Sequence, residues 1–260
     1  MMGHGHATMG AVGWVALTST SAGALGVLPM APAQVAAGAL VTAGAALLPD
    51  ADHHNGTIAH SLPPVSNVVT RVVGQASGGH RHGTHSIVGV LVAFALAWLL
   101  APLRIDLPWG LADDFQIGAW LLIVFMVSFA FKALRIIRGW KTAWLTSMLC
   151  GTAAVYFAPD QLWWLPLSVG MGCAIHILGD VLTTQGCPLL WPLRPKPLVE
   201  TPLWAKNGHF ALPVLGTAGS WREWVLVVAM NAYLACIIAE TFAPGSVSAL
   251  GRAILAGITG

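Results

Sequence analysis

Charged residues are scarce in this chain, because Asp, Glu, Lys and Arg make up only 8% of its 260 residues. A soluble globule of this length needs more polar side chains than that to cover its surface. Hydrophobic residues account for 56% of the chain, and the mean hydropathy is +0.73. The composition therefore excludes an ordinary soluble enzyme and predicts an all-α, polytopic helical membrane protein.

Three further features are missing. The four cysteines form no CxxC pair, so we expect buried free thiols rather than a disulfide framework. No Lys or Arg precedes the first apolar run, so the positive region of a cleaved signal peptide is absent and we expect this segment in the mature protein. No repeat of fixed period appears, which predicts a single membrane-embedded domain over residues 1–260.

Apolar runs define the expected transmembrane helices, each of which needs about 20 residues to cross a bilayer. The second run is short and rich in Ala and Gly, so a buried or re-entrant helix is an alternative there. Polar loops are predicted at 50–84 and 184–220, and residues 243–260 are predicted to form a peripheral tail or a partial eighth segment. We predict about seven spans, at roughly 8–28, 33–49, 85–103, 115–136, 142–158, 161–182 and 221–242.

The charges orient this arrangement. If the chain changes side at each span, the N-terminus and both polar loops lie on one face. The positive-inside rule makes that face cytoplasmic, although the same charges can also attract anionic lipid head groups or phosphate esters. Ten of the twelve Lys and Arg residues fall there, namely Arg71, Arg81, Lys132, Arg135, Arg138, Lys141, Arg194, Lys196, Lys206 and Arg222.

Residues that can bind metals gather at the ends of the spans, first in the segment LLPDADHH at 47–54. A helix is expected to end at Pro49 and to be followed by Asp50, Asp52 and His53. Carboxylate oxygen and imidazole nitrogen suit Zn²⁺ and Mn²⁺. A polar turn with no metal would have the same composition, so both interpretations stay open.

The second segment is GHRHGTHS at 79–86, which leads into a span. Thr84 is a candidate N-cap, with His85 in the first turn of the helix and His80 in the loop before it. Arg81 lies between these two histidines. Loop histidines are often only solvated, which is our interpretation of His82.

The third segment is HILGD at 176–180, near the end of an apolar helix. Residues four apart share one helical face about 6 Å apart, so His176 and Asp180 can bind one ion, or the aspartate can orient the histidine. A mutual hydrogen bond within a buried helix pair is the alternative. Ionisable groups at membrane depth are costly and usually functional.

The runs LLPDADH, GHRHGTHS and HILGDVLTTQGCPLLWP, in this order, resemble the membrane-bound metal-dependent hydrolase family of the YdjM type over roughly residues 4–225. His82, His54, Thr184 and Cys187 depart from the family pattern. More distantly, the family is similar to the zinc phospholipase C and P1 nuclease superfamily of phosphate ester hydrolases. The resemblance implies a set of metal-binding residues, namely His6, Asp50, His80, His85, His176, Asp180 and Glu223. It also implies that Asp52 and His53 either bind the metal or hold the residues that do.

The resemblance also implies a reaction. One to three divalent ions, expected to be Zn²⁺ with Mn²⁺ as the alternative, would activate a water, Asp52 would accept its proton, and Arg81 would neutralise a phosphoryl oxygen. The implied protein is a phosphoesterase at the cytoplasmic face of a bacterial-type inner membrane, acting on a phosphate-ester or lipid substrate among membrane lipids, with nothing to indicate a nucleic-acid partner. A non-catalytic scaffold with a structural metal is the main alternative. A metal transporter is disfavoured, because transport favours polar groups at mid-span.

Overall fold

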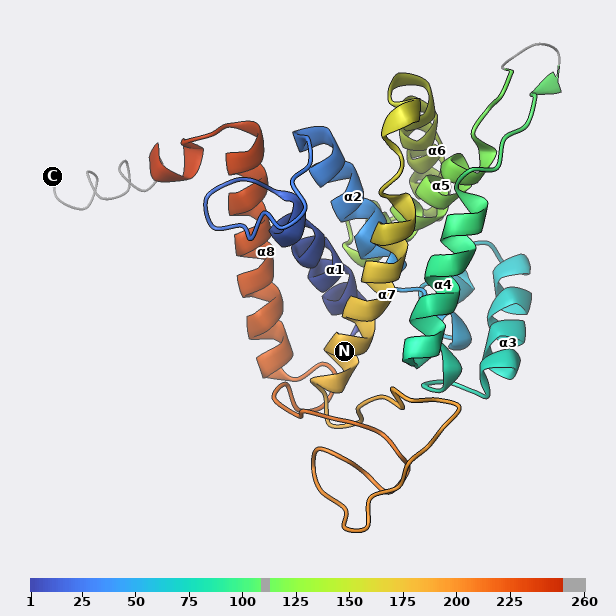
Figure 1. The fold of residues 1–260 in the computed structure, drawn as a ribbon, viewed down its shortest axis with the longest axis vertical. Coiled ribbons are helices and arrows are strands. Elements are labelled where there is room, and N and C mark those ends of the chain that lie inside the picture. Colours follow the sequence, from blue (N-terminus) through green and yellow to red (C-terminus); the bar gives the residue numbers. More distant parts are fainter. Residues whose placement is uncertain (109–112, 250–260) are drawn as a thin grey trace, which may run out of the picture.

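A computed structural model describes residues 1–108 and 113–249, and within them the chain is all-α, as predicted (Figure 1). These residues form isolated β-bridges but no β-strand. The 3-10 turns are η1 (Pro49–Asp52), η2 (Ile58–His60), η3 (Gly83–His85) and η5 (Pro159–Gln161). The α-helices are α1 (Gly3–Thr18), α2 (Pro32–Ala45), α3 (Val65–Ser77), α4 (Ile87–Leu100), α5 (Ile117–Ala133), α6 (Trp140–Phe157), α7 (Leu165–Val181) and α8 (Trp221–Phe242).

Each predicted span overlaps with one of these helices. Three helical segments are long and apolar enough to cross a membrane, and α4 and α5 are shorter apolar helices. The three segments are Pro32–Asp52, Pro159–Val181 and Trp221–Phe242. The predicted C-terminal tail is described only as far as residue 249, so the remainder of that prediction lies outside the described residues.

The first predicted span, 8–28, is wrong in its bounds. Helix α1 begins five residues earlier and ends at Thr18. Ser19 is extended, and Gly23 and Gly26 have positive φ angles of 91° and 58°. Glycine adopts this left-handed backbone readily, so the Gly-containing segment after Thr18 forms a loop instead of a longer helix.

Helix α2 is the central helix of the bundle. It contacts α1, α5 and α7, and eight of its fourteen residues are buried. Its small side chains allow other backbones to approach closely, because a Cβ at Gly44 would lie only 1.8 Å from the carbonyl oxygen of Met126 on α5. This Ala/Gly-rich segment is largely buried, and the stretch Pro32–Asp52 is also long and apolar enough to span a membrane. The chain that follows α2 therefore emerges in the middle of the molecule.

The prediction of a loop throughout 50–84 is wrong at α3. An amphipathic helix usually turns its apolar face toward the core, but the apolar residues of α3 point outward. A sequence pattern that assumes a buried apolar face therefore does not predict this helix. Its thirteen residues are too few to span a bilayer, but an outward apolar face is typical of a helix at a membrane surface. The buried residues of α3 are Ser66, Thr70 and Ser77, and the exposed valines are Val65, Val68, Val69 and Val72.

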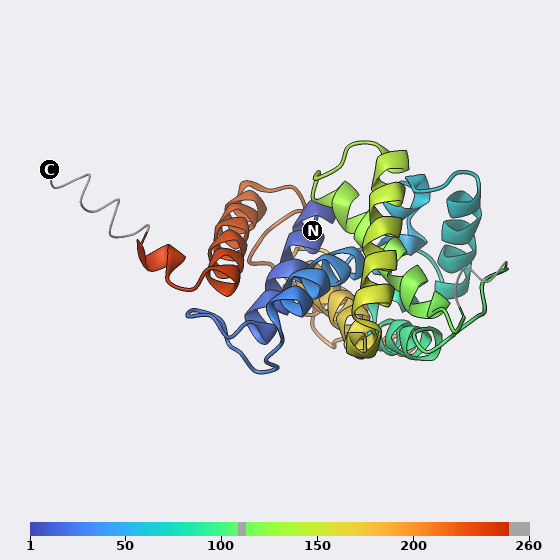
Figure 2. The ribbon, with the colours of Figure 1, turned by 90° about the horizontal axis from the view of Figure 1, so that it is seen from above.

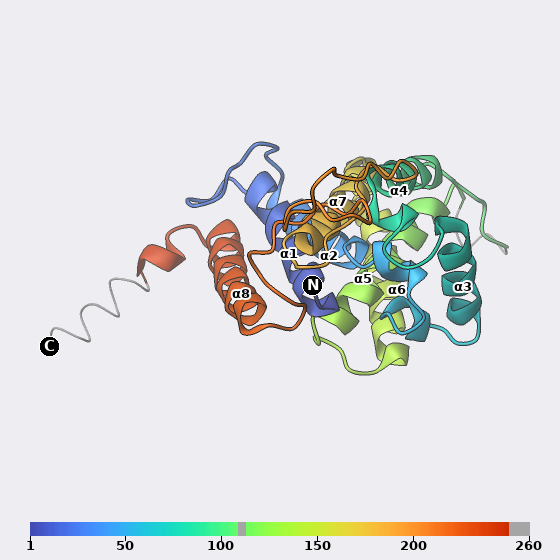
Figure 3. The ribbon, with the colours of Figure 1, turned by 90° about the horizontal axis from the view of Figure 1, so that it is seen from below.

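The peripheral elements frame one end of the bundle. Helix α8 packs against α1 at one side, and α3 lies at the opposite side of the molecule (Figure 2). The segment from 184 to 220 runs across the end at which α7 stops and α8 starts (Figure 3). The start of α1 and the turn after α2 meet α7 at this same end. The candidate site lies there.

Candidate metal centre

The side chains of the two aspartates in the turn η1, Asp50 and Asp52, point in different directions. A 3-10 helix has three residues per turn, so residues two apart do not share a face. Asp50 Oδ1 lies 3.7 Å from His176 Nε2 on α7 and 3.5 Å from His85 Nε2 on η3. Asp52 instead points to the loop before η3, where its Oδ1 lies 2.8 Å from His80 Nδ1.

Helix α7 contributes an imidazole and a carboxylate from one face, as their spacing predicts. Asp180 Oδ2 lies 3.7 Å from His176 Nε2 and 3.6 Å from His85 Nε2. Its other oxygen, Oδ1, contacts the Arg81 guanidinium at 3.1 Å, His6 Nε2 at 3.3 Å and the Met1 amino group. Asp180 is 1% exposed, so it is a buried carboxylate at the meeting point of three chain segments.

Two imidazole nitrogens face each other at the centre of the cluster. His176 Nδ1 lies 2.7 Å from the Ala46 carbonyl oxygen, which can only accept a hydrogen bond. Nδ1 therefore carries the proton, and Nε2 is left with a lone pair. This Nε2 lies 3.2 Å from His85 Nε2. Two facing nitrogen lone pairs repel each other, so the arrangement fits a shared proton or a cation at this point.

His6 joins the cluster from α1. Its ring stacks on His176 with a centroid distance of 3.7 Å and an interplanar angle of 14°. The close approach depends on Gly179, where a Cβ would lie 3.1 Å from His6 Nδ1 and 2.8 Å from Met1 Sδ. His6 Nδ1 is buried and has no hydrogen-bond partner among the described residues. A buried imidazole nitrogen without a partner is a candidate ligand.

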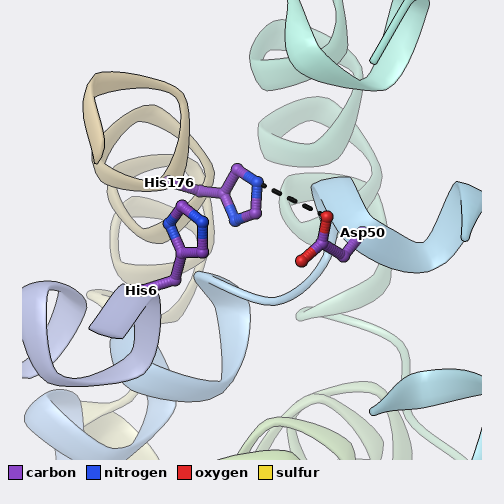
Figure 4. A group of neighbouring side chains, drawn as sticks. All are labelled: His6, Asp50 and His176. Atoms are coloured by element: carbon purple, nitrogen blue, oxygen red, sulfur yellow. Dashed lines mark ion pairs between the residues drawn. The ribbon is translucent and has the colours of Figure 1, made fainter. Parts of the chain in front are cut away.

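Six predicted ligands form three overlapping groups whose nitrogen or oxygen atoms lie within 4.8 Å of one another. Figure 4 shows the first group, in which His6 and His176 lie together and Asp50 faces them from η1. Each group shares one residue with each other group. The groups are His6, Asp50 and His176; Asp50, His80 and His85; and His85, His176 and Asp180.

Asp52 lies behind these groups and not within them. It accepts hydrogen bonds from the Arg81 backbone N–H at 3.1 Å and from the Thr84 hydroxyl at 2.5 Å, in addition to its contact with His80. Its Oδ2 also lies 3.4 Å from His85 Nδ1. The side chain is fully buried, and both oxygens are occupied by protein donors. This geometry orients the His80 and His85 rings, as carboxylates behind metal-binding histidines do.

The N-cap expected at Thr84 is instead Ser86, whose hydroxyl accepts the Gly89 N–H at 3.2 Å. The turn η3 delays the start of α4 by two residues, which frees the Thr84 hydroxyl to donate to Asp52. The prediction of an N-cap in this segment is confirmed, but its assignment to Thr84 is wrong.

Two further predicted ligands lie outside the three groups. The buried Glu223 accepts the Met2 N–H at 2.7 Å and the Gly219 N–H at 2.8 Å, so it links the start of α8 to the start of the chain. His53 is partly exposed; its Nδ1 accepts the Asn55 N–H at 3.2 Å, and its ring packs 4.5 Å from that of His80.

The electrostatics of the cluster favour positive charge. Burial lowers the pKa of His85, but hydrogen bonds with Asp50 and Asp52 outweigh burial and raise that pKa to about 9. In the metal-free protein, His85 therefore holds a proton at neutral pH. A divalent cation would neutralise the negative charge of the surrounding carboxylates in the same way. The donor set, the orphaned His6 nitrogen and the buried carboxylates all fit such an ion.

The fold and the site define a class: a helical membrane protein with a buried His/Asp cluster that can hold metal ions. A family model described as YdjM inner membrane protein matches residues 1–243. The chain therefore belongs to the YdjM inner membrane protein family. Comparisons with curated proteins and with solved structures gave no match.

Proposed function

We propose that this protein is a metal-dependent phosphoesterase of the inner membrane, with its site on the cytoplasmic side of a bundle of about seven transmembrane helices. One observation carries the proposal: three ligand groups overlap at one end of the bundle, and a buried carboxylate orients two of their histidines. A purely structural site needs only one closed set of ligands. Overlapping groups favour a cluster of ions, which is the arrangement used for phosphoryl transfer.

The ligand atoms favour two ions. Each neutral histidine presents one nitrogen to the cluster, so His176 and His85 cannot serve all three groups at once. The histidines that would hold the ions are His6, His80, His85 and His176, and a cation would fit between His176 Nε2 and His85 Nε2. Asp50 would contribute as well, because its Oδ1 faces His176 and His85 at similar distances. Zn²⁺ suits this mixture of nitrogen and oxygen donors, and Mn²⁺ is the alternative.

A bound divalent ion would lower the pKa of a water toward 7. Asp50 is then better placed than Asp52 to accept the proton. Its side chain is 26% exposed, and its Oδ2 forms no hydrogen bond or ion pair among the described residues, whereas both oxygens of Asp52 contact nitrogen or hydroxyl groups of the protein. The water oxygen would bond to phosphorus as the bond from phosphorus to the ester oxygen breaks, and the proton accepted by Asp50 would pass to the departing alcohol.

Arg81 is a cation beside this cluster. Its guanidinium contacts Asp180 and is 13% exposed, so it lies at the edge of the cluster and not inside it. There it can neutralise a phosphoryl oxygen as negative charge develops. An Arg81→Met variant is expected to lose about 10²- to 10³-fold in kcat, the range for removing one transition-state donor.

The test combines metal analysis with activity on phosphomonoesters and phosphodiesters. Purified wild-type protein is expected to retain stoichiometric divalent metal and to cleave an ester, while His176→Ala and Asp50→Asn lose both properties. His209→Ala is the control, because His209 lies in the 184–220 segment outside the three ligand groups. Absence of stoichiometric metal in the wild type would overturn the proposal. Bound metal without cleavage of any ester would favour the structural-metal scaffold instead.

A further inference from the structure

An apolar groove of about 490 Å³ runs along α4 beside the metal centre. Helix α3 borders it through Val73 and Ala76, and α4 contributes Val92, Ala93 and Leu96. Residues of α5 and α7 close its floor. Val92 and Leu96 are about half exposed, so the groove opens sideways between α3 and α4, where a bilayer would surround the bundle.

One end of the groove reaches the residues next to the ligands. Pro49 and Ala51 line it, and they flank Asp50 on either side. Thr84 also lines it and directly precedes His85. A molecule lying in the groove would therefore have one end beside the cluster and would extend away from it along α4.

The length of the groove matches one leaflet of a bilayer. Its lining extends along α4 as far as Leu100, and fourteen helical residues cover about 20 Å. One leaflet of the hydrocarbon core is about 15 Å thick. A groove of this length can follow a hydrocarbon chain from the surface toward the middle of the membrane.

A single hydrocarbon chain is the occupant that an apolar groove of this volume favours. The surrounding solvent of an inner membrane protein also consists of such chains, so they reach the groove without leaving the bilayer.

A second and more polar cavity lies on the other flank of α3. It measures about 770 Å³ and is lined by polar groups, among them Asp52, His60, Arg71 and Gln75. Both cavities touch η1, one through Asp52 and the other through Ala51. An amphiphile with a polar head and an apolar tail matches this pair of neighbouring cavities.

We infer that the substrate is a lipid phosphate ester whose acyl tail lies in the groove between α3 and α4 and enters it sideways from the membrane. The inference has two halves: the catalytic half, that the lipid ester is cleaved, rests on the proposed phosphoesterase function, and the binding half is that a lipid tail occupies the groove. The groove by itself, however, is a lipid-binding site whether or not the ester is cleaved.

The catalytic half is tested by blocking the groove. Ala93→Phe fills it, and Leu96→Trp narrows its mouth at an exposed position that tolerates a large side chain. The matched controls are Ala95→Phe and Leu99→Trp, on the same helix at exposed positions outside the groove lining. The measurement is kcat/KM for dioleoyl phosphatidic acid relative to that for p-nitrophenyl phosphate.

Both groove variants are expected to reduce this ratio at least tenfold, while both controls keep the wild-type ratio. A wild-type ratio in the groove variants, or an equal reduction in the controls, would overturn the assignment of the tail to the groove. Melting temperature and metal content are measured for all four variants, so that loss of folding is recognised.

The binding half is tested without turnover. A phosphatidylglycerol with a diazirine in its acyl chain is photolysed in nanodiscs that contain the wild type, Ala93→Phe or the metal-site variant His176→Ala. We expect crosslinks on the groove residues of the wild type and of His176→Ala, and their loss in Ala93→Phe. Crosslinks spread evenly around α4 would overturn the inference. If crosslinks lie in the groove but no ester is cleaved, the proposed function fails and the lipid site stands.

Discussion

Charged side chains are buried at one end of the helix bundle and exposed at the other. At the site end, Asp52 and Asp180 are almost fully buried, and each contacts several donors. At the other end, Arg104 and Asp114 form a single ion pair with side chains that are 46% and 67% exposed. Burial without partners costs several kcal/mol, whereas an exposed pair costs little. The buried aspartates therefore depend on their donors, whereas the exposed pair costs little when it is broken.

The largest expected effect comes from removing a central ligand. His176→Ala deletes the nitrogen shared by two of the three ligand groups and is expected to weaken metal binding by more than about 100-fold, beyond the range for residues behind the ligands. Titration of metal into the metal-free protein measures the change. Near wild-type affinity in this variant would show that the metal lies elsewhere.

A change of pH should have the next largest effect. His85 has a pKa of about 9 in the metal-free protein and must release that proton to bind a metal, so affinity should fall up to about tenfold for each pH unit below 9. The stability of the metal-free protein should change in the opposite sense. In the folded protein the pKa of His85 is raised above its usual value near 6.5. The protonated ring therefore contributes its full share to the free energy of unfolding below pH 6.5, and this contribution is lost as the pH rises through 9.

Metal titrations from pH 6 to pH 9, paired with thermal unfolding of the metal-free protein, measure both trends. The same titrations on His85→Ala provide the control, because the pH dependence due to this ring should disappear. A steep profile retained in His85→Ala would assign the proton to another group.

A smaller effect is expected at the carboxylate behind the ligands. Asp52→Asn keeps the shape of the side chain but loses its charge, so His80 and His85 would be oriented less firmly, and metal affinity should fall about 10- to 100-fold with unchanged stoichiometry. Calorimetric titration distinguishes affinity from stoichiometry. A reduced number of bound ions would make Asp52 itself a ligand.

The smallest effect is expected at the far end of the bundle. Asp114→Asn breaks the exposed pair with Arg104 and should change the free energy of unfolding by less than about 1 kcal/mol, with metal binding unaffected. Chemical denaturation and metal titration check both statements. A loss comparable to that of Asp52→Asn would erase the contrast between the two ends.

Much of this architecture was predictable because the chain is so apolar. Hydrophobic runs mark helices regardless of their neighbours, so each of the seven predicted spans overlaps with a helix. The four-residue spacing of His176 and Asp180 fixed their common face, since helical geometry is local. Helix α3 was missed because its apolar face points outward and its buried face is polar, the reverse of the pattern expected in a soluble protein.

By itself, the sequence determined the membrane-protein class, the helices and the residue types that collect at their ends, because these follow from composition and from spacing along the chain. Only the tertiary structure decided which of those residues meet. It gave Asp50 and Asp52 opposite directions within one turn, took Glu223 out of the cluster to hold the start of the chain, and put an apolar groove beside the ligands. These outcomes depend on contacts between residues up to 221 positions apart, which no local pattern encodes.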